Sequence, residues 1–215
     1  MCPRDGAKRR TQERILDAAE RVFAEKGYHQ TLVDEIARTS RTSKGAVYFH
    51  FPSKEALFAA LMDRLAARLL REVEEAIAEE RGGVAKVRAA LEAVTRRLAR
   101  HRRLAKVLLV QSFSSPAFVR KRLEVLERFA GLVRAQLDDA VAEGSIAPVD
   151  TAVVAHAWLG AVHELVVRWL YTGEPPLERA VPELTALLLR SVGLDPESEP
   201  ERPSTKTREQ KREQS

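Results

Sequence analysis

The sequence has a single cysteine, Cys2, no asparagine, and aromatic residues at only 6% of its 215 positions. One cysteine excludes a disulfide within the chain and a metal site built from several thiolates. No apolar run approaches the roughly 18 residues that span a bilayer, and no apolar segment follows the basic N-terminus, so we expect no signal peptide. We therefore expect a cytoplasmic protein with no membrane partner.

Motifs of catalysis are missing as well. The chain contains no HExxH, P-loop, GxSxG or GxGxxG pattern, and no Glu-x-x-His pair of the kind that binds di-iron in helical bundles. His156 and His163 lie seven residues apart and share a helix face, but core or interface histidines explain them better than a metal pair. We predict no catalytic residue, no metal and no cofactor, and keep a helical-bundle enzyme as an alternative.

The residues that are abundant favour helices. Leu, Ala, Val, Glu and Arg dominate, and apolar residues recur in steps of three and four, whereas no period-two pattern indicates a strand. The sequence predicts an all-α fold of nine helices. Their expected positions are 11–26, a short helix after 31–34, 43–50, 53–80, 84–100, 103–112, 115–144, 151–172 and 177–192.

Polar residues mark where these helices begin and end. Thr11 is predicted to cap the first helix and Gly27 to end it, Thr31 to cap the second, and Thr42 or Ser43 to cap the third. Ser53 and Ser115, each beside a proline, are predicted to begin the fourth and seventh helices, and Asp150 to cap the eighth. No hydrophobic residue follows Leu194, so residues 195–215 are expected to form a disordered tail.

The stretch 36–57 is the most informative part of the chain, because it indicates a helix, a four-residue turn and a second helix. That second helix begins with small or polar residues at 42–46. In a helix-turn-helix the recognition helix enters the major groove by its N-terminal end, where bulky side chains would block the approach. Val47 and Phe51 are expected to face inward and to pack near Phe23. The sequence thus predicts binding to double-stranded DNA.

This stretch resembles the signature of the TetR family of bacterial regulators, over about residues 11–58. The matching residues are Ser43-Lys44-Gly45-Ala46-Val47-Tyr48-Phe49-His50-Phe51, Ser53-Lys54-Glu55 and, upstream, Ile15, Ala18, Phe23, Gly27 and Thr31. The resemblance implies a nine-helix TetR-like architecture, with a three-helix helix-turn-helix domain at 1–55 and a helical ligand-binding and dimerisation domain at 56–194. It also implies a ligand-responsive regulator, a repressor by family expectation, that binds a palindromic operator as a homodimer through helices 8 and 9.

By the same resemblance, the third helix and its flanks supply the DNA contacts. The implied residues are Thr31, Arg41, Thr42, Ser43, Lys44, Gly45, Ala46, Tyr48, His50 and Lys54. From the residues alone, Lys44 and Lys54 are the best phosphate ligands. The basic segment Lys8-Arg9-Arg10 is a further candidate for contact with a minor groove or with the DNA backbone.

Arg41 departs from the family pattern, which has glycine at this turn position. A turn residue with positive φ costs a non-glycine residue on the order of 1 kcal/mol. Either Arg41 accepts that strain or the turn differs, and Arg41 is also a candidate for a phosphate or base contact.

The remaining helices are expected to enclose an effector pocket between the fourth and the eighth. The candidate lining residues are Leu61, Gln111, Phe113, Phe118, Phe129, Trp158, His163 and Trp169. The segment HELVVRWLYTGE from His163 resembles the same helix in the acyl-CoA-responsive regulators of fatty acid degradation in this family. A small hydrophobic or amphipathic effector is expected, with a fatty acyl-CoA as the specific hypothesis, and an architectural DNA-binding protein without effector stays open as an alternative.

Overall fold

A computed structural model describes residues 3–111 and 114–197, and over these residues it is all-α with nine helices and no strand. The all-α prediction and the number of helices are confirmed. The helices are α1 (Pro3–Gln30), α2 (Val33–Thr39), α3 (Lys44–His50), α4 (Lys54–Ala78), α5 (Gly83–Arg100), α6 (Arg102–Gln111), α7 (Pro116–Ala142), α8 (Thr151–Thr172) and α9 (Leu177–Arg190).

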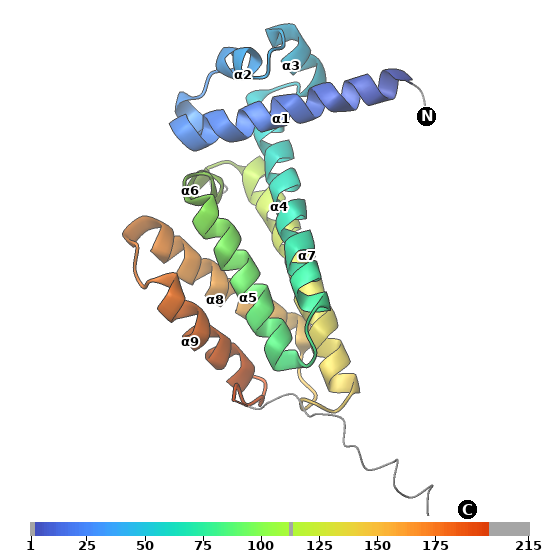
Figure 1. Ribbon diagram of the computed structural model, residues 1–215, viewed down its shortest axis with the longest axis vertical. Helices are drawn as coiled ribbons and strands as arrows, with labels where there is room; N and C mark the ends of the chain where they lie inside the picture. Colours follow the sequence, from blue (N-terminus) through green and yellow to red (C-terminus); the bar gives the residue numbers. More distant parts are fainter. Residues whose placement is uncertain (1–2, 112–113, 198–215) are drawn as a thin grey trace, which may run out of the picture.

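Figure 1 shows how these helices are arranged along the long axis of the molecule. The three N-terminal helices form one end, with α1 lying across the top of α4. The long helix α4 runs from that end down into the part built by α5 to α9. The predicted DNA-binding helices and the predicted effector domain are therefore connected through α4.

Helix α1 is longer than the sequence predicts. It begins at Pro3 rather than near residue 11, and the Thr11 hydroxyl donates within the helix to the carbonyl oxygen of Ala7 at 3.1 Å instead of capping it. Alanine, lysine and arginine between residues 7 and 10 are good helix formers, so the helix extends through them. Gly27 interrupts it with φ 76° and ψ 174°, so the break is where we expected, but the backbone is not left-handed helical.

Most of the predicted N-caps are present. The side-chain oxygens of Ser43, Ser53, Ser115 and Asp150 each accept a hydrogen bond from the backbone N–H three residues further on. The prediction for Thr31 is wrong, because Leu32 occupies the N-cap position of α2. Its N–H donates to the Glu35 carboxylate at 3.2 Å, and Thr31 lies in the core.

Four aromatic rings join the N-terminal helices to the rest of the molecule. Phe23 and Tyr28 come from α1, Phe58 from α4 and Phe118 from α7, and neighbouring ring centroids lie 4.9–5.8 Å apart. All four side chains are buried. One apolar core therefore contains residues from both sides of the predicted domain boundary at residue 55.

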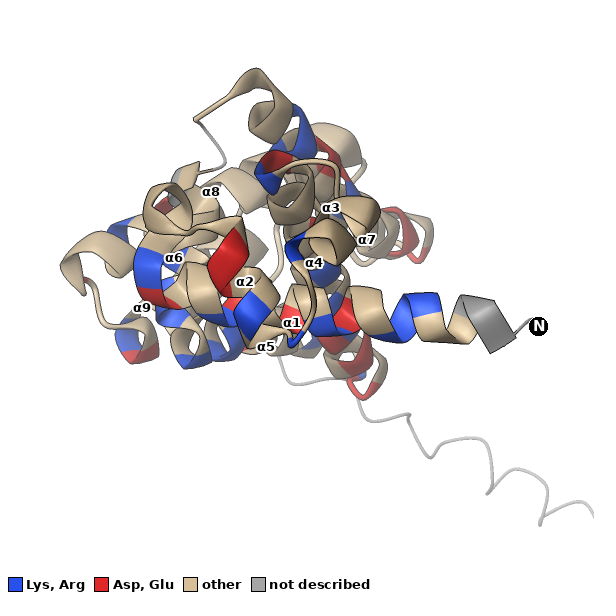
Figure 2. Cartoon of the chain, turned by 90° about the horizontal axis from the view of Figure 1, so that it is seen from above, with Lys and Arg blue, Asp and Glu red and all other residues tan. Residues whose placement is uncertain are grey.

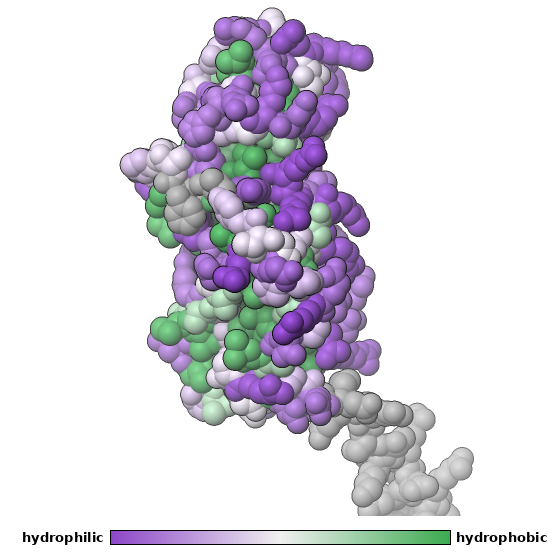
Figure 3. Space-filling model, turned by 90° about the vertical axis from the view of Figure 1, so that its left-hand side faces the viewer, coloured by the Kyte–Doolittle hydropathy of each residue, from purple (hydrophilic) through white to green (hydrophobic). Residues whose placement is uncertain are grey.

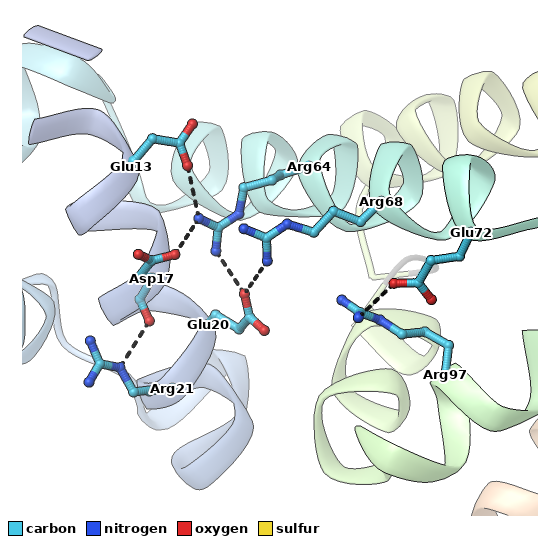
Figure 4. Close-up of polar contacts among 8 residues, drawn as sticks. All are labelled: Glu13, Asp17, Glu20, Arg21, Arg64, Arg68, Glu72 and Arg97. Carbon is cyan, nitrogen blue, oxygen red and sulfur yellow. Dashed lines mark hydrogen bonds and ion pairs between the residues drawn. The ribbon is translucent and has the colours of Figure 1, made fainter. Parts of the chain in front are cut away.

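An arginine on α4 provides a second connection between α4 and α1. The Arg64 guanidinium, 10% exposed, lies 2.7 Å from both Asp17 and Glu20 and 3.4 Å from Glu13 (Figure 4). Arg68, one turn further along α4, contacts only Glu20, at 3.5 Å. Since the three carboxylates lie along one side of α1, Arg64 fixes how α1 sits against α4.

The second core is formed by α5, α7, α8 and α9. Trp158 of α8 packs in it against α9, and its indole N–H donates to the Ser191 hydroxyl at 3.0 Å. Pro182 lies inside α9 without ending it. Of the tail predicted at 195–215, only residues 195–197 are described. No helix in the described part of the chain is both long and apolar enough to span a membrane.

Candidate functional site

The face formed by α2 and α3 has the packing that the sequence predicts for a helix-turn-helix. Val47 and Phe51 are buried in the same core cluster as Phe23 and Ile36. Because these side chains hold α3 from below, the residues between them and at the start of α3 point away from the core. Ser43, Lys44, Gly45, Tyr48 and Phe49 are all exposed.

Arg41 ends α2 in a conformation that usually requires glycine. Its φ is 53°, and it is the one non-glycine residue with positive φ in the described part of the chain. The Arg41 N–H donates to the carbonyl of Arg38 at 3.1 Å, and the Thr42 N–H donates to that of Ala37 at 2.9 Å. These two bonds define a Schellman motif with Arg41 at its left-handed position. Of the two alternatives that the sequence left open at this turn, the structure has the one in which Arg41 adopts a positive φ.

Two other helix ends have the same hydrogen-bond pattern with glycine at this position. Gly144 after α7 has φ 73° and donates to Val141, while the next N–H donates to Ala140. Gly193 after α9 has φ 80° and makes the equivalent bond to Arg190. Arg41 therefore carries a backbone strain that the two glycines do not have.

Replacing Arg41 with glycine should raise the free energy of unfolding by about 1 kcal/mol, because glycine adopts positive φ without strain. Urea unfolding followed by circular dichroism measures the change. The matched control is Arg38→Gly, since Arg38 is an exposed residue within α2, where glycine should cost up to about 1 kcal/mol. Destabilisation by both substitutions would contradict the strain at Arg41. A weaker affinity for DNA in the stabilised variant would assign a DNA contact to the arginine side chain.

The N-terminal end of α3 is open and polar. The Lys44 ammonium lies 3.0 Å from the exposed Asp34 carboxylate of α2, and this hydrogen bond raises the pKa of Lys44. Gly45 is exposed, and a Cβ there would meet only the Ser43 hydroxyl oxygen, at 3.9 Å. The packing of the protein therefore does not require glycine at this position.

One exposed aromatic residue was missed by the site prediction. Phe49 is 73% exposed, and the Lys8 ammonium lies 5.4 Å from its ring centre. The signal was available, because a helix that buries Val47 and Phe51 must turn Phe49 outward. Figure 2 shows α1 extending beyond the other helices, with Lys and Arg on the extension. The basic segment Lys8-Arg9-Arg10 is thus helical, and its first residue lies beside α3.

Two predicted contact residues are engaged within the protein. The Thr31 side chain is fully buried and its hydroxyl donates to the carbonyl of Gly27 at 2.6 Å, so it does not reach the surface. The Lys54 ammonium donates to the carbonyls of Tyr28 and Thr31 at 2.9 and 3.0 Å and lies 4.5 Å from the centre of the Tyr28 ring. These contacts hold the end of α1 against α4, and the role of Lys54 as a phosphate ligand stays a prediction.

The other residues predicted to contact DNA differ in how far their side chains are exposed. Thr42 is half-buried and its hydroxyl shares a hydrogen bond of 2.8 Å with that of Ser40. Ala46 and His50 are also half-buried. Burial and the nearby charge of Lys8 lower the pKa of His50. Arg41, Ser43, Lys44, Gly45 and Tyr48 form the exposed part of the predicted set.

A cavity of about 240 Å³ lies between α4, α5, α6, α7 and α8, where the sequence analysis expected a pocket. Four of the helices line it with residues at the spacing i, i+3, i+4, i+7, which is one helix face. These are Met62, Leu65, Ala66 and Leu69 on α4; Val94, Arg97, Leu98 and His101 at α5; Arg122, Val125, Leu126 and Phe129 on α7; and Leu159, Val162, His163 and Val166 on α8. Helix α6 adds Leu104, Ala105, Leu108 and Leu109.

The few polar side chains of this wall are basic or neutral, and no carboxylate belongs to it. Arg97 contacts the Glu72 carboxylate, which lies outside the lining, at 2.9 Å. Burial, together with the nearby charge of Arg122, lowers the pKa of His163. The cavity is therefore apolar, with two arginines and no carboxylate among its lining residues. It suits a hydrophobic ligand with a negative group.

Only two of the predicted pocket residues, Phe129 and His163, line this cavity. Leu61 and Phe118 are buried in the core near α1, and Gln111 is buried with its amide donating to the Ser114 hydroxyl. Trp158 packs against α9, and the Trp169 ring lies beside the Arg102 guanidinium, 4.7 Å from it. Phe113 lies outside the described residues. The described part of the chain also contains no group of three His, Cys, Asp or Glu that could hold a metal ion.

Two family models match the chain. Residues 15–61 match the one described as bacterial regulatory proteins, tetR family, and residues 80–192 match the one described as tetracyclin repressor-like, C-terminal domain. The second match alone covers more than half of the chain. It includes most of the helices that enclose the cavity.

The chain is also similar to individual proteins. The chain is 27% identical to the fatty acid metabolism regulator protein of Bacillus subtilis over 165 residues, which is 76% of this chain and 85% of the relative. It is 40% identical over 91 residues to the transcriptional activator FasR of Mycolicibacterium smegmatis, covering 42% and 40% of the two chains. The solved structure of the regulator FadR from Bacillus subtilis in complex with stearoyl-CoA has a TM-score of 0.74 at 25% identity, covering 82% of this chain and 96% of that one.

Proposed function

The chain belongs to the tetR family of bacterial regulatory proteins, and on this premise we propose that it is a repressor that binds a palindromic operator as a homodimer and is released by a fatty-acyl effector. The observation that carries the effector is the cavity between α4 and α8, which is apolar with Arg97 and Arg122 in its wall. The observation that carries DNA binding is the exposed N-terminal end of α3. Transcriptional regulation itself is the function named for the relatives described above.

The start of α3 has the properties of a recognition helix. Its first residues are small or polar, and Gly45 leaves the surface open where the major groove would approach. Lys44 places a cation beside the N-terminal end of the helix, whose free N–H groups attract phosphate. Tyr48 and Phe49 extend the same exposed face by one turn.

The effector proposal rests on the chemistry of the cavity and on the relatives. An acyl chain needs an apolar tunnel, and a thioester of coenzyme A also brings phosphates that need basic partners. The similar structure of FadR from Bacillus subtilis was solved in complex with stearoyl-CoA. These points support a fatty acyl-CoA, or the corresponding fatty acid, as the effector.

The outer faces of α8 and α9 support a homodimer. Val153, Ala157 and Gly160 are exposed along one seam of α8, and a Cβ at Gly160 would meet no other atom of the protomer within 4 Å. Leu187 of α9 is 62% exposed. Figure 3 looks onto the side where α8 and α9 lie and shows hydrophobic surface gathered in its lower half. Small and apolar residues on such a face favour close packing with a second copy of the chain. In such a dimer the two recognition helices, one from each protomer, would lie about 34–36 Å apart or one helical turn of DNA further.

Selection of bound DNA from a random pool tests the proposal. We expect the purified chain to enrich a palindrome, and stearoyl-CoA to release that DNA in a mobility-shift assay. Enrichment without a consensus sequence would instead identify an architectural DNA-binding protein. Turnover of an acyl-CoA by the purified chain would favour the helical-bundle enzyme.

Lys44→Ala should weaken binding to the selected operator and reduce the slope of log K against log salt by about one unit, because one phosphate contact is lost. Fluorescence anisotropy at a series of salt concentrations measures the slope. Lys86→Ala is the control, since Lys86 lies on α5 and bonds to Gln136, away from α3. An unchanged slope in Lys44→Ala would remove Lys44 from the proposed phosphate contacts.

A further inference from the structure

Three charged residues of α4 form a line that runs from α1 to the cavity wall. Arg64, Arg68 and Glu72 are spaced by four residues, so they lie along one face of the helix. The first two contact carboxylates of α1, whereas Glu72 contacts Arg97 of α5 (Figure 4). The same face of α4 thus carries ion pairs to the recognition end and to the cavity.

Arg97 has two neighbours of different kinds. Its guanidinium contacts the Glu72 carboxylate at 2.9 Å, and Arg97 is also one of the residues that line the cavity. The Arg97 side chain is 19% exposed, and its partner Glu72 is 40% exposed and better solvated. Since the cavity lining contains no carboxylate, an anion that entered the cavity would be the second acceptor for Arg97.

We propose that Arg97 is the residue that recognises the anionic group of the effector, and that Glu72 is a built-in competitor for it. The proposal rests on the proposed effector cavity and specifies its ligand as an anion carried on an apolar chain. The carboxylate of a free fatty acid and a phosphate of an acyl-CoA share this chemistry, because both accept a charge-assisted hydrogen bond from a guanidinium.

This competition couples the ligand to α4. An anion that binds Arg97 weakens the ion pair between Arg97 of α5 and Glu72 of α4. By linkage, a strong Arg97–Glu72 pair lowers the affinity for the anionic ligand. Ligand binding and the α4–α5 pair therefore oppose each other. Loss of Glu72 and loss of Arg97 should accordingly change ligand affinity in opposite directions.

Isothermal titration of the full-length protein with dodecanoic acid, dodecanol and dodecanoyl-CoA tests the assignment. In Arg97→Gln we expect the affinity for the acid or the thioester to fall at least about tenfold, with dodecanol affected little. In Glu72→Gln we expect the same anionic ligand to bind about two- to fivefold tighter. Which of the two anionic ligands responds identifies carboxylate or phosphate as the group bound. Arg96→Gln, an exposed neighbour on α5 outside the cavity wall, should change neither.

Changes of opposite sign in the affinity for the anionic ligand show that Arg97 recognises the ligand. If the Arg97–Glu72 ion pair were only structural, both variants would shift the melting temperature alike and leave the ligand preference unchanged. The assignment is overturned if neither anionic ligand loses affinity relative to dodecanol in Arg97→Gln. It is also overturned if Glu72→Gln weakens the anionic ligand. If the wild-type chain binds none of the three ligands, the proposed effector class itself fails, and Arg97 has no ligand to recognise.

Discussion

Phe118→Ala should lower the free energy of unfolding by about 3–5 kcal/mol, which is the cost of truncating a fully buried aromatic side chain. Phe118 is 2% exposed, and its ring lies 5.1 Å from that of Phe58 and 5.5 Å from that of Tyr28. The substitution leaves a cavity where α1, α4 and α7 meet. Because this cluster joins the recognition helices to the rest of the molecule, we also expect the operator affinity to fall.

Urea unfolding monitored by circular dichroism measures this loss, and Phe129→Ala is the matched control. Phe129 lies on the same helix but is only half-buried and lines the effector cavity. Its truncation should cost less stability and should change the affinity for the effector, which Phe118→Ala leaves unchanged at temperatures where the variant is folded. Equal stability losses in the two variants would contradict the different positions of the two rings.

Arg64→Ala should cost about 2–3 kcal/mol of stability, because the truncation removes two charge-assisted hydrogen bonds of 2.7 Å and a longer one of 3.4 Å. It also leaves three carboxylates of α1 without their shared cation. The mostly solvated Asp17 and Glu13 keep the cost below that of a fully buried ion pair. Arg68→Ala should cost less than about 1 kcal/mol, since Arg68 makes one contact at 3.5 Å and is 35% exposed.

The same unfolding experiment at low and high salt compares these two arginines. The difference between the variants should persist at high salt, because Arg64 itself is shielded from solvent. Equal losses from Arg64→Ala and Arg68→Ala would show that the Arg64 contacts with α1 contribute no more than an exposed ion pair. Operator affinity should fall with Arg64→Ala as well, since the position of α1 supports α3.

The helices could be predicted from the sequence because their ends are encoded locally. Ser43, Ser53, Ser115 and Asp150 cap the helices where we expected, since a short side-chain oxygen before an apolar periodic run has few other local uses. Thr31 failed as a cap because its methyl group suits the core, so tertiary packing moved the helix start by one residue. The turn at Arg41 stayed open in the sequence, because a non-glycine residue there could either accept a positive φ or change the turn, and the structure has the positive φ.

The cavity could not be predicted in detail, because aromatic residues were chosen over aliphatic ones. Phe118 and Trp158 are as apolar as any lining residue, but they fill cores, whereas the wall is mainly leucine, valine and alanine. Whether an apolar helix face packs against another helix or lines a cavity depends on how five helices pack together. A local sequence pattern contains no information about that packing. Arg97 and Arg122 were the available signal, since a single cation within an i, i+3, i+4, i+7 apolar face is unusual.

The length of α4 has a mechanical consequence. With 25 residues and a rise of 1.5 Å per residue, the helix is a stiff rod of about 37 Å. A tilt of about 5° around its cavity end moves the other end by about 3 Å, which is the full length of a hydrogen bond. Since α4 follows α3 in the chain and α1 is held against α4 by Arg64, that displacement reaches both helices of the proposed DNA-binding face. A small displacement at the cavity end of α4 would therefore become a displacement of several ångströms at its other end, without any unfolding. That is the scale at which contacts with DNA bases would be made or lost.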